Sequence, residues 1–305
     1  MNIKEFTAFA AEEVLEYLRE EGEEQVTVRT TELMKMNDQV LHGLTFQKGD
    51  DPAPTFYLDE MFRAFEEGVP REELLRGLAR AYRDGMANGP MPTEIPDLEY
   101  SKITDRVGVR LLGMDYNERF LETAPCREVG NGYALICEVH IGASDGGLFS
   151  TIVTNDMANE YGYDIDRLFD IALKNEWTNN AAFFGSADSL LNEDLPGRDD
   201  ETCYVLTTQR QRYGAAALFY PGTQEMIARV LEEGYYAIPS SLHEFIILRE
   251  SRVNDPEVLR QMVTEANRII VRPEEVLSDS LLYYSRSTGE LSRVLPQEAY
   301  ADFAG

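Results

Sequence analysis

The sequence predicts an α+β protein, in which a helix and β-hairpin N-terminal region is followed by a mixed, largely antiparallel sheet packed with helices. Segments with helical periodicity alternate with short runs of β-branched and aromatic residues, and several of these runs are close enough to pair as hairpins. The chain has 305 residues, of which 43% are hydrophobic, so it is long and apolar enough to bury a core.

The N-terminal elements follow from periodicity and turn residues. Apolar side chains recur at helical spacing in the first twenty residues, and Gly68-Val69-Pro70 ends one helix and opens the next. The region is predicted to hold, in order, a helix at 3–20, strands at 26–30 and 40–46 around a turn at 36–39, and helices near 57–67 and 71–86.

The later elements mix helices with hairpins. Asp164 is a helix N-cap and Gly234 a C-terminal cap, while Pro256 suits a first helical turn. We expect, in order, a helix and a strand within 100–113, strands at 133–141 and 148–154, a helix at 164–175, a hairpin of 203–209 and 215–220, a helix at 221–234, strands on either side of Pro239-Ser240-Ser241, a helix at 255–268 and a hairpin at 281–294.

A boundary is predicted where periodicity stops. The stretch GPMPTEIPDLE at 89–99 holds three prolines and no repeating apolar pattern. We therefore expect an N-terminal region at 1–90, a Pro-rich linker at 91–99 and a mixed α/β domain at 100–305, an arrangement that is also compatible with packing as one unit.

The formal net charge of −27 excludes whole classes of partner. Direct binding to nucleic acid or to an anionic membrane needs clustered Lys and Arg, which the sequence lacks. Acidic residues interrupt the N-terminal apolar run, and no stretch is long enough to span a membrane, so we expect a cytoplasmic protein. The thiols Cys126, Cys137 and Cys203 are scattered and predicted to be reduced, and no cofactor is predicted.

The segment PSSLHE, at 239–244, is the most suggestive stretch for chemistry. Ser241, His243 and Glu244 contain the residue types of a nucleophile with its base, and strand alternation puts Ser241 and His243 on one face. No G-x-S-x-G elbow surrounds them, however, and Pro-Ser is ordinary turn chemistry. We interpret the segment as a hairpin corner first and as a hydrolase site second.

Other candidates are weaker. His42 and His140 lie in apolar, strand-like runs, which is typical of packed histidines, and the glycine cluster at 142–147 lacks the spacing of a nucleotide loop. Arg210 and Arg212 form the one local basic spot, which could hold an anion or balance nearby acids. Asp164, Asp166 and Asp170 are weak candidates for a divalent ion, although their spacing does not fit an EF-hand. The acidic loop at 192–201 is a solvated loop or a weak docking surface for a basic partner, formed by Glu193, Asp194, Asp199, Asp200 and Glu201.

Several segments together resemble an uncharacterised family of anaerobic gut bacteria, a domain-of-unknown-function family. They are GLTF…PTFYLDE near the N-terminus, YVLTTQRQRYGAAALFYPG, YYAIPSSLHEFIIL and RPEEVLSDSLLYY. A second uncharacterised bacterial family is more distantly similar over the C-terminal part. The resemblance implies an architecture and a cytoplasmic bacterial setting, and it implies no activity and no catalytic residues.

The sequence therefore favours a non-enzymatic binding or regulatory protein whose acidic surface engages a basic protein, with mimicry of nucleic acid as a sharper version. A hydrolase-type enzyme using Ser241, His243 and Glu244 is the alternative. A structural protein of a mobile element is a third hypothesis.

Overall fold

The computed structural model describes residues 1–49, 54–88, 97–144, 147–186 and 203–295. The chain divides into two compact units, one formed by 1–35 and 39–96 and the other by 36–38 and 97–305. The boundary between Pro96 and Asp97 falls within the segment for which the sequence predicts a linker. The α+β class is confirmed. Within the described ranges, no helix combines the length and apolar character needed to cross a membrane.

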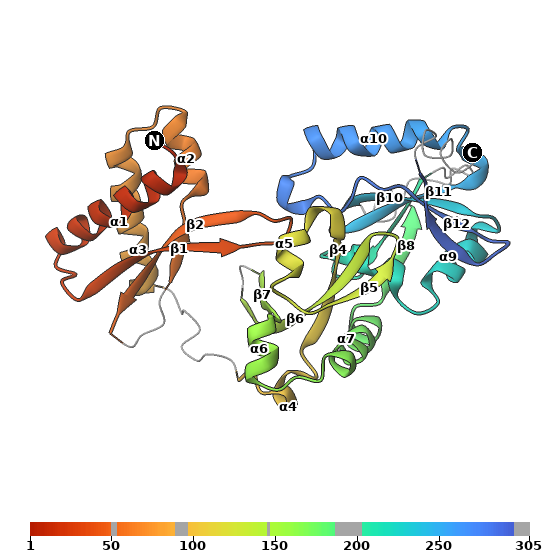
Figure 1. Ribbon diagram of the computed structural model, residues 1–305, viewed down its shortest axis with the longest axis horizontal. Coiled ribbons are helices and arrows are strands. Elements are labelled where there is room, and N and C mark those ends of the chain that lie inside the picture. Colours follow the sequence, from red (N-terminus) through yellow and green to blue (C-terminus); the bar gives the residue numbers. More distant parts are fainter. Residues whose placement is uncertain (50–53, 89–96, 145–146, 187–202, 296–305) are drawn as a thin grey trace. The chain divides into compact units, whose positions relative to one another are not determined.

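The first unit packs helices on a small antiparallel sheet of order β1-β2-β3 (Figure 1). Asn2 and Glu5 form a capping box that starts the first helix, and every fourth residue from Phe6 is apolar and buried. The elements are α1 (Ile3–Glu20), β1 (Val26–Met34), β2 (Val40–Lys48), β3 (Thr55–Tyr57), α2 (Asp59–Glu66) and α3 (Arg71–Asn88).

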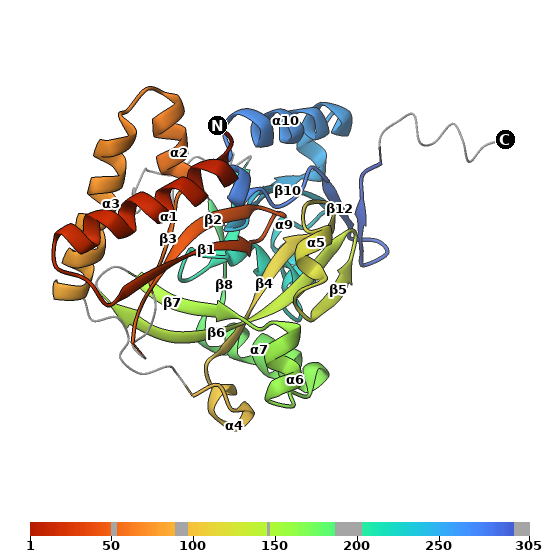
Figure 2. The ribbon, with the colours of Figure 1, turned by 60° about the vertical axis from the view of Figure 1, so that its left-hand side comes forward.

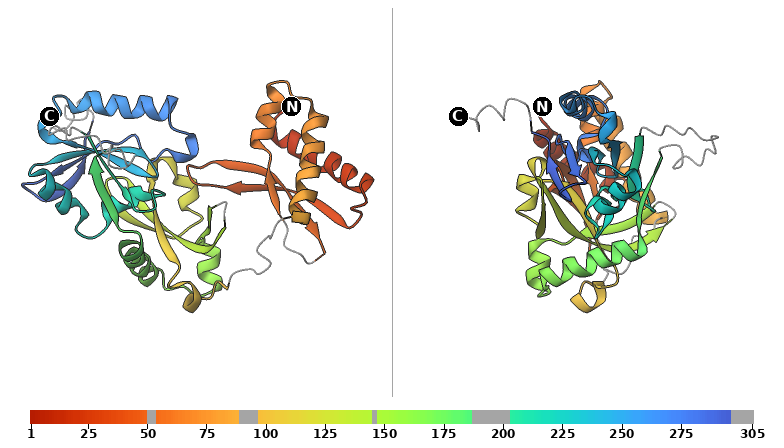
Figure 3. Two further views of the ribbon diagram at one scale, coloured as in Figure 1. Left: turned by 180° about the vertical axis from the view of Figure 1, so that it is seen from behind. Right: turned by 90° about the vertical axis from the view of Figure 1, so that its right-hand side faces the viewer.

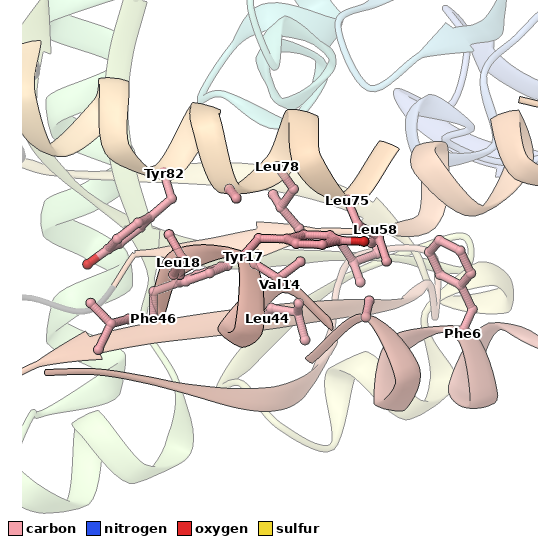
Figure 4. Packing of buried hydrophobic residues seen from close by; sticks show 13 residues of the cluster. Phe6, Val14, Tyr17, Leu18, Leu44, Phe46, Leu58, Leu75, Leu78 and Tyr82 are labelled. Carbon is pink, nitrogen blue, oxygen red and sulfur yellow. The ribbon is translucent and has the colours of Figure 1, made fainter. Parts of the chain in front are cut away.

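Aliphatic and aromatic side chains make up the core cluster of this unit. Figure 4 shows Leu75, Leu78 and Tyr82 of α3 facing side chains of α1 and β2. The rings of Phe46 and Tyr82 stack with their centroids 4.8 Å apart. Each large side chain buried in this way contributes about 1.5–3 kcal/mol, so helix and sheet hold each other in place.

The second unit contains two antiparallel sheets. In the first, β4 pairs with one edge of the long β6, while β5 and β7 share its other edge at opposite ends. The helix α7 packs on β4 and β6 (Figure 3). The elements of this first half are α4 (Tyr100–Ile103), β4 (Val107–Gly113), η1 (Met114–Tyr116), α5 (Glu118–Leu121), β5 (Cys126–Gly130), β6 (Tyr133–Ser144), β7 (Gly147–Ile152), α6 (Asn155–Glu160) and α7 (Ile165–Asn179).

The other sheet has the order β13-β12-β10-β11-β9-β8, and α10 runs beside β10 (Figure 2). The short helix η2 joins the two sheets, since it contacts β4 on one side and β9 and β11 on the other. The elements are β8 (Ala182–Ser186), β9 (Cys203–Thr208), η2 (Gly214–Phe219), α9 (Thr223–Leu231), β10 (Tyr235–Ser241), β11 (Glu244–Arg249), η3 (Glu250–Arg252), α10 (Pro256–Ile269), η4 (Pro273–Glu275), β12 (Leu282–Ser285) and β13 (Glu290–Arg293).

Three local predictions are wrong. The apolar run at 215–220 lies in the helix η2 and not in a returning strand, because it is buried on all sides and needs no sheet alternation. The helix α9 ends at Leu231, and its C-cap is Glu232, which takes the left-handed conformation with φ of 63°, and not Gly234. The turn after β10 lies at Leu242-His243 and not at Pro239-Ser240-Ser241.

Pro239 fits within a strand for a simple reason. It is paired with Phe245 of β11, but on its other side the pairing of β10 with β12 covers only 235–237. A proline that lacks a neighbouring strand on one side loses no ladder hydrogen bond there. The strand can therefore continue past the proline, through a bulge, to Ser241.

Candidate functional site

A cavity open to solvent lies in the second unit, with a volume of about 40 Å³. This volume holds a few water molecules or one compact chemical group, since one water needs roughly 10–15 Å³. The lining comes from β4, β6, β7, the end of α7 and the loop after β9, and consists of Val109, Glu138, His140, Ser150, Glu176, Asn180, Arg210, Arg212 and Tyr213.

Strand geometry brings the first part of the lining together. Glu138 and His140 are two residues apart on β6, so their side chains lie on the same face. Gly108 of β4 is the partner of Glu138, and Ser150 of β7 is the partner of His140. A Cβ atom added at Gly108 would overlap the Oε1 atom of Glu176 and would lie 3.5 Å from the Cε1 atom of His140. The missing side chain of Gly108 thus lets the Glu176 carboxyl approach His140.

Glu138 forms a buried ion pair with Arg110. The Arg110 Nε atom donates to Glu138 Oε2 at 2.7 Å, and its Nη2 atom also contacts that oxygen. Arg110 Nη2 donates to the Ser150 hydroxyl at 2.8 Å as well, and the guanidinium lies 3.8 Å from the centre of the Tyr213 ring. Both charged residues are buried, with 7% and 5% of their surfaces exposed. The pair is therefore fixed by several contacts at once.

These contacts determine the charge of Glu138. Burial alone would raise its pKa, but hydrogen bonds from His140, Arg110 and Ser150 and the charge of Arg110 outweigh burial and lower the pKa to about 2. Its other oxygen, Oε1, lies 3.5 Å from His140 Nε2. In a neutral imidazole that donates from one ring nitrogen to a carboxylate, the other ring nitrogen is an acceptor.

Glu176 is a buried carboxyl of the opposite kind. Asn180 Nδ2 donates to its Oε2 at 2.7 Å, and the Tyr220 hydroxyl lies 3.4 Å from the same oxygen. Burial raises the pKa of Glu176, and the nearby Glu138 adds to the rise, although Asn180, His140 and Arg210 partly offset it. The cavity thus has two carboxyl groups whose environments move their pKa values apart.

The loop after β9 closes one side of the cavity. Gln211 and Tyr213 both have left-handed backbones, with φ of 52° and 53°. Two hydrogen bonds fix the loop: Arg210 N donates to Asn180 Oδ1 at 3.1 Å, and Tyr213 N donates to His243 Nδ1 at 3.0 Å. Non-glycine residues persist in this conformation only where their surroundings impose it.

The predicted PSSLHE site is assembled differently from a nucleophile with its base. The His243 backbone N–H donates to the Ser241 hydroxyl oxygen at 3.0 Å, so the two residues meet through the main chain. The ring of His243 accepts from Tyr213 at Nδ1, and its Nε2 atom lies 3.5 Å from Glu275 Oε1. Glu244 accepts from Ser240 at 3.3 Å. The corner therefore holds a loop in place, and its use in hydrolysis stays a prediction that this geometry does not favour.

Of the three aspartates of the predicted divalent site, one caps a helix and two lie beside Arg127. Asp164 caps α7 by accepting from Arg167 N, and Asp170 pairs with Arg127 at 2.8 Å. The side chain of Asp166 is almost fully exposed. Among the residues that the structure describes, no group of His, Cys, Asp and Glu side chains is arranged to hold a metal ion.

The residues predicted as an acidic docking surface lie outside the described residues: Glu193, Asp194, Asp199, Asp200 and Glu201. His42 and His140 are both placed. His42 contacts Asp59 through Nδ1 at 3.2 Å in the first unit, whereas His140 lines the cavity. The sequence singled out Arg210 and Arg212 as an anion site, and both line the same cavity.

The protein thus has an α+β fold, and its second unit contains a polar cavity with a buried ion pair and a second buried carboxyl group. The chain belongs to a family of unknown function, DUF5688, whose family model matches residues 3–286. The predicted membership in a domain-of-unknown-function family is thereby confirmed. No curated protein and no solved structure matches the chain.

Proposed function

We propose that the protein is a hydrolase-type enzyme that uses the cavity for general acid–base catalysis. The observation that supports this proposal is the presence of two carboxyl groups, Glu138 and Glu176, near His140 in an open cavity, with environments that favour opposite protonation states. Pairs of this kind are how enzymes supply an acid and a base at one pH.

Each residue has a role in this scheme. His140, oriented by Glu138, takes a proton from a water molecule through its free ring nitrogen. The water oxygen attacks the electrophilic centre of the substrate, and Glu176 gives its proton to the leaving oxygen or nitrogen. One water is consumed, and the proton on His140 returns to Glu176 through solvent. Arg110 keeps Glu138 ionised and in place.

Water is a better nucleophile here than Ser150. The Ser150 hydroxyl accepts a hydrogen bond from Arg110 and contributes a hydrogen bond to Glu138, so it is used to hold the ion pair. A serine nucleophile would instead need its hydroxyl on the base. Replacing Ser150 with alanine should weaken catalysis less than replacing His140.

The first test needs no substrate. Infrared difference spectra should show a carboxylic acid band that persists above the pH at which the exposed glutamates ionise and that disappears in E176Q. If the Glu176 carboxyl titrates with the surface carboxyl groups, it is not available as the acid and the scheme is wrong.

The second test is turnover of nitrophenyl esters and phosphates. H140Q and E176Q should each lower the rate by about 10²–10⁴-fold, the usual contribution of a positioned acid or base. E265Q is the matched control, because Glu265 is an exposed residue of α10. Hydrolysis that is equally fast in all four proteins would contradict the assignment.

A second candidate function rests on the net charge of −27, which favours a basic protein partner in the cytoplasm over nucleic acid. The free thiols of Cys126, Cys137 and Cys203, of which Cys126 is exposed, support a reducing compartment. Capture of partners from the host at low and moderate salt tests this candidate. Binding that is insensitive to salt would contradict it.

A further inference from the structure

Two arginines, Arg210 and Arg212, line the cavity of a protein with 55 acidic and 28 basic residues. A third, Arg110, contacts the lining residues Glu138 and Tyr213. Arg110 is neutralised by its ion pair with Glu138. A second carboxyl group, Glu176, is buried, and burial raises its pKa. The guanidinium groups that line the cavity are those of Arg210 and Arg212, in the loop after β9.

The loop presents its two arginines to the same small space. They are separated only by Gln211, whose left-handed backbone turns the chain between them. The Arg212 guanidinium lies 5.1 Å from the centre of the Tyr213 ring, which also contacts Arg110. The anchors at Asn180 and His243 fix the backbone on both sides of this turn. The fold thus fixes the backbone of the loop, from which the exposed side chains of Arg210 and Arg212 reach the cavity.

The residue type and the cavity size define the ligand. A guanidinium presents donors in a planar fork that matches the oxygens of a carboxylate or a phosphate. A volume of about 40 Å³ accepts one such group, while the rest of the ligand extends toward solvent. The net charge of the protein repels anions at long range, so recognition depends on these short contacts.

We propose that the substrate carries a compact oxyanion, a carboxylate or a phosphate, which Arg210 and Arg212 bind beside His140 and Glu176. This inference rests on the proposed function and names its substrate class. The oxyanion is the recognition handle, and the bond to be broken lies next to it, within reach of the acid and the base.

Calorimetric titration of the full chain with inorganic phosphate and, separately, with succinate at constant ionic strength tests the inference. The wild type should bind at least one of them, and R210Q/R212Q should weaken binding by about 10-fold or more, because hydrogen bonds to charged groups contribute about 1.5–3 kcal/mol. R229Q, which changes an exposed arginine of α9, should bind as the wild type does. R210K/R212K keeps the charge but loses the forks, and should be intermediate.

Each outcome has a meaning. Binding of phosphate alone identifies a phosphate ester substrate, and binding of succinate alone identifies a carboxylate. If wild type and R210Q/R212Q bind both anions equally, or bind neither, the inference is wrong. The acid band of Glu176 is measured without any anion, so its presence would keep the proposed acid–base function when the anion inference fails. E176Q should lose turnover while it retains anion binding.

Discussion

The segments around His243 and His140, both in the second unit, each place a glutamate near a histidine, but the two histidine rings have different contacts. His243 has Ser241 and Glu244 beside it in sequence, yet one of its ring nitrogens accepts from the main chain of Tyr213. His140 has Glu138 two residues away, and its ring is oriented by that carboxylate at the edge of an open cavity.

Residue types at short spacing in the sequence therefore do not by themselves define a catalytic site. A histidine can act as a base only if one ring nitrogen is free to accept a proton and the ring reaches solvent or substrate. The ring of His140 lines the open cavity, while His243 accepts a hydrogen bond from the loop that closes the same cavity. Both regions therefore contribute to one cavity, His140 to its lining and His243 to the position of the loop.

The largest expected effect comes from breaking the ion pair behind His140. R110A leaves the Glu138 carboxylate buried without its partner, which should lower the free energy of unfolding by about 3–5 kcal/mol. Urea unfolding measures this loss. K4A breaks the exposed pair of Lys4 with Glu32 and should cost much less, because solvent screens an exposed ion pair. Equal losses in the two variants would show that burial does not matter here.

The pH dependence of stability should differ in sign between the two carboxyl groups. The pKa of Glu138 is lowered to about 2, so its stabilising contribution is present above its unfolded pKa of about 4.3 and is lost as the pH falls toward 2. The pKa of Glu176 is raised, so its contribution is present below the unfolded pKa and is lost as the pH rises through the folded value.

The free energies of unfolding of the wild type, E138Q and E176Q, measured across pH about 2–7, give the pH dependence of both contributions. The advantage of the wild type over E138Q should grow as the pH rises from about 2 to 5, and its advantage over E176Q should shrink above about pH 4. If the advantage of the wild type over both variants changed with pH in the same direction, the environments of Glu138 and Glu176 would not shift their pKa values in opposite directions.

Substitutions at two glycines, Gly214 and Gly108, should distinguish an effect on stability from an effect on turnover. A side chain at Gly214 would overlap Thr207 Oγ1 and come within 2.7 Å of the His243 carbonyl oxygen, so G214A should cost about 1–3 kcal/mol. A side chain at Gly108 would displace the carboxyl end of Glu176. G108A should therefore lose less stability and more of the turnover. The reverse pattern would place the chemistry at the corner.

The smallest effect is expected at His243 itself. H243A removes the acceptor for Tyr213 N and should lower the free energy of unfolding by about 1 kcal/mol, the value of one ordinary hydrogen bond. H243N should lose less, since an asparagine oxygen can accept from the same N–H. Thermal unfolding gives the stabilities, and turnover by H243N close to that of the wild type would agree with a supporting role.

Local signals in the sequence predicted much of the fold. The apolar spacing of α1, the Asp164 cap of α7 and the Pro256 start of α10 depend on residues a few positions apart, and all three helices are present. The run at 215–220 was not predictable in the same way, because a short apolar stretch has no period that separates a buried helix from a buried strand.

The cavity was only partly predictable. Arg210 and Arg212 are adjacent enough in sequence to be noticed as a basic spot. Glu138 and Glu176 were missed because a single acid in a strand or helix is usually on the surface, and only the tertiary fold buries them. The signal that was available was a glutamate two residues before a histidine in an apolar strand, where a buried partner is required.

Gly108 and Glu176 are far apart in the chain, yet the carboxyl group of Glu176 lies where a side chain at position 108 would be. A larger residue at position 108 therefore needs a shorter side chain at position 176. In the history of this family the two positions should be inherited as a pair. A lineage that acquires alanine at position 108 is expected to tolerate it only after position 176 has become aspartate or smaller.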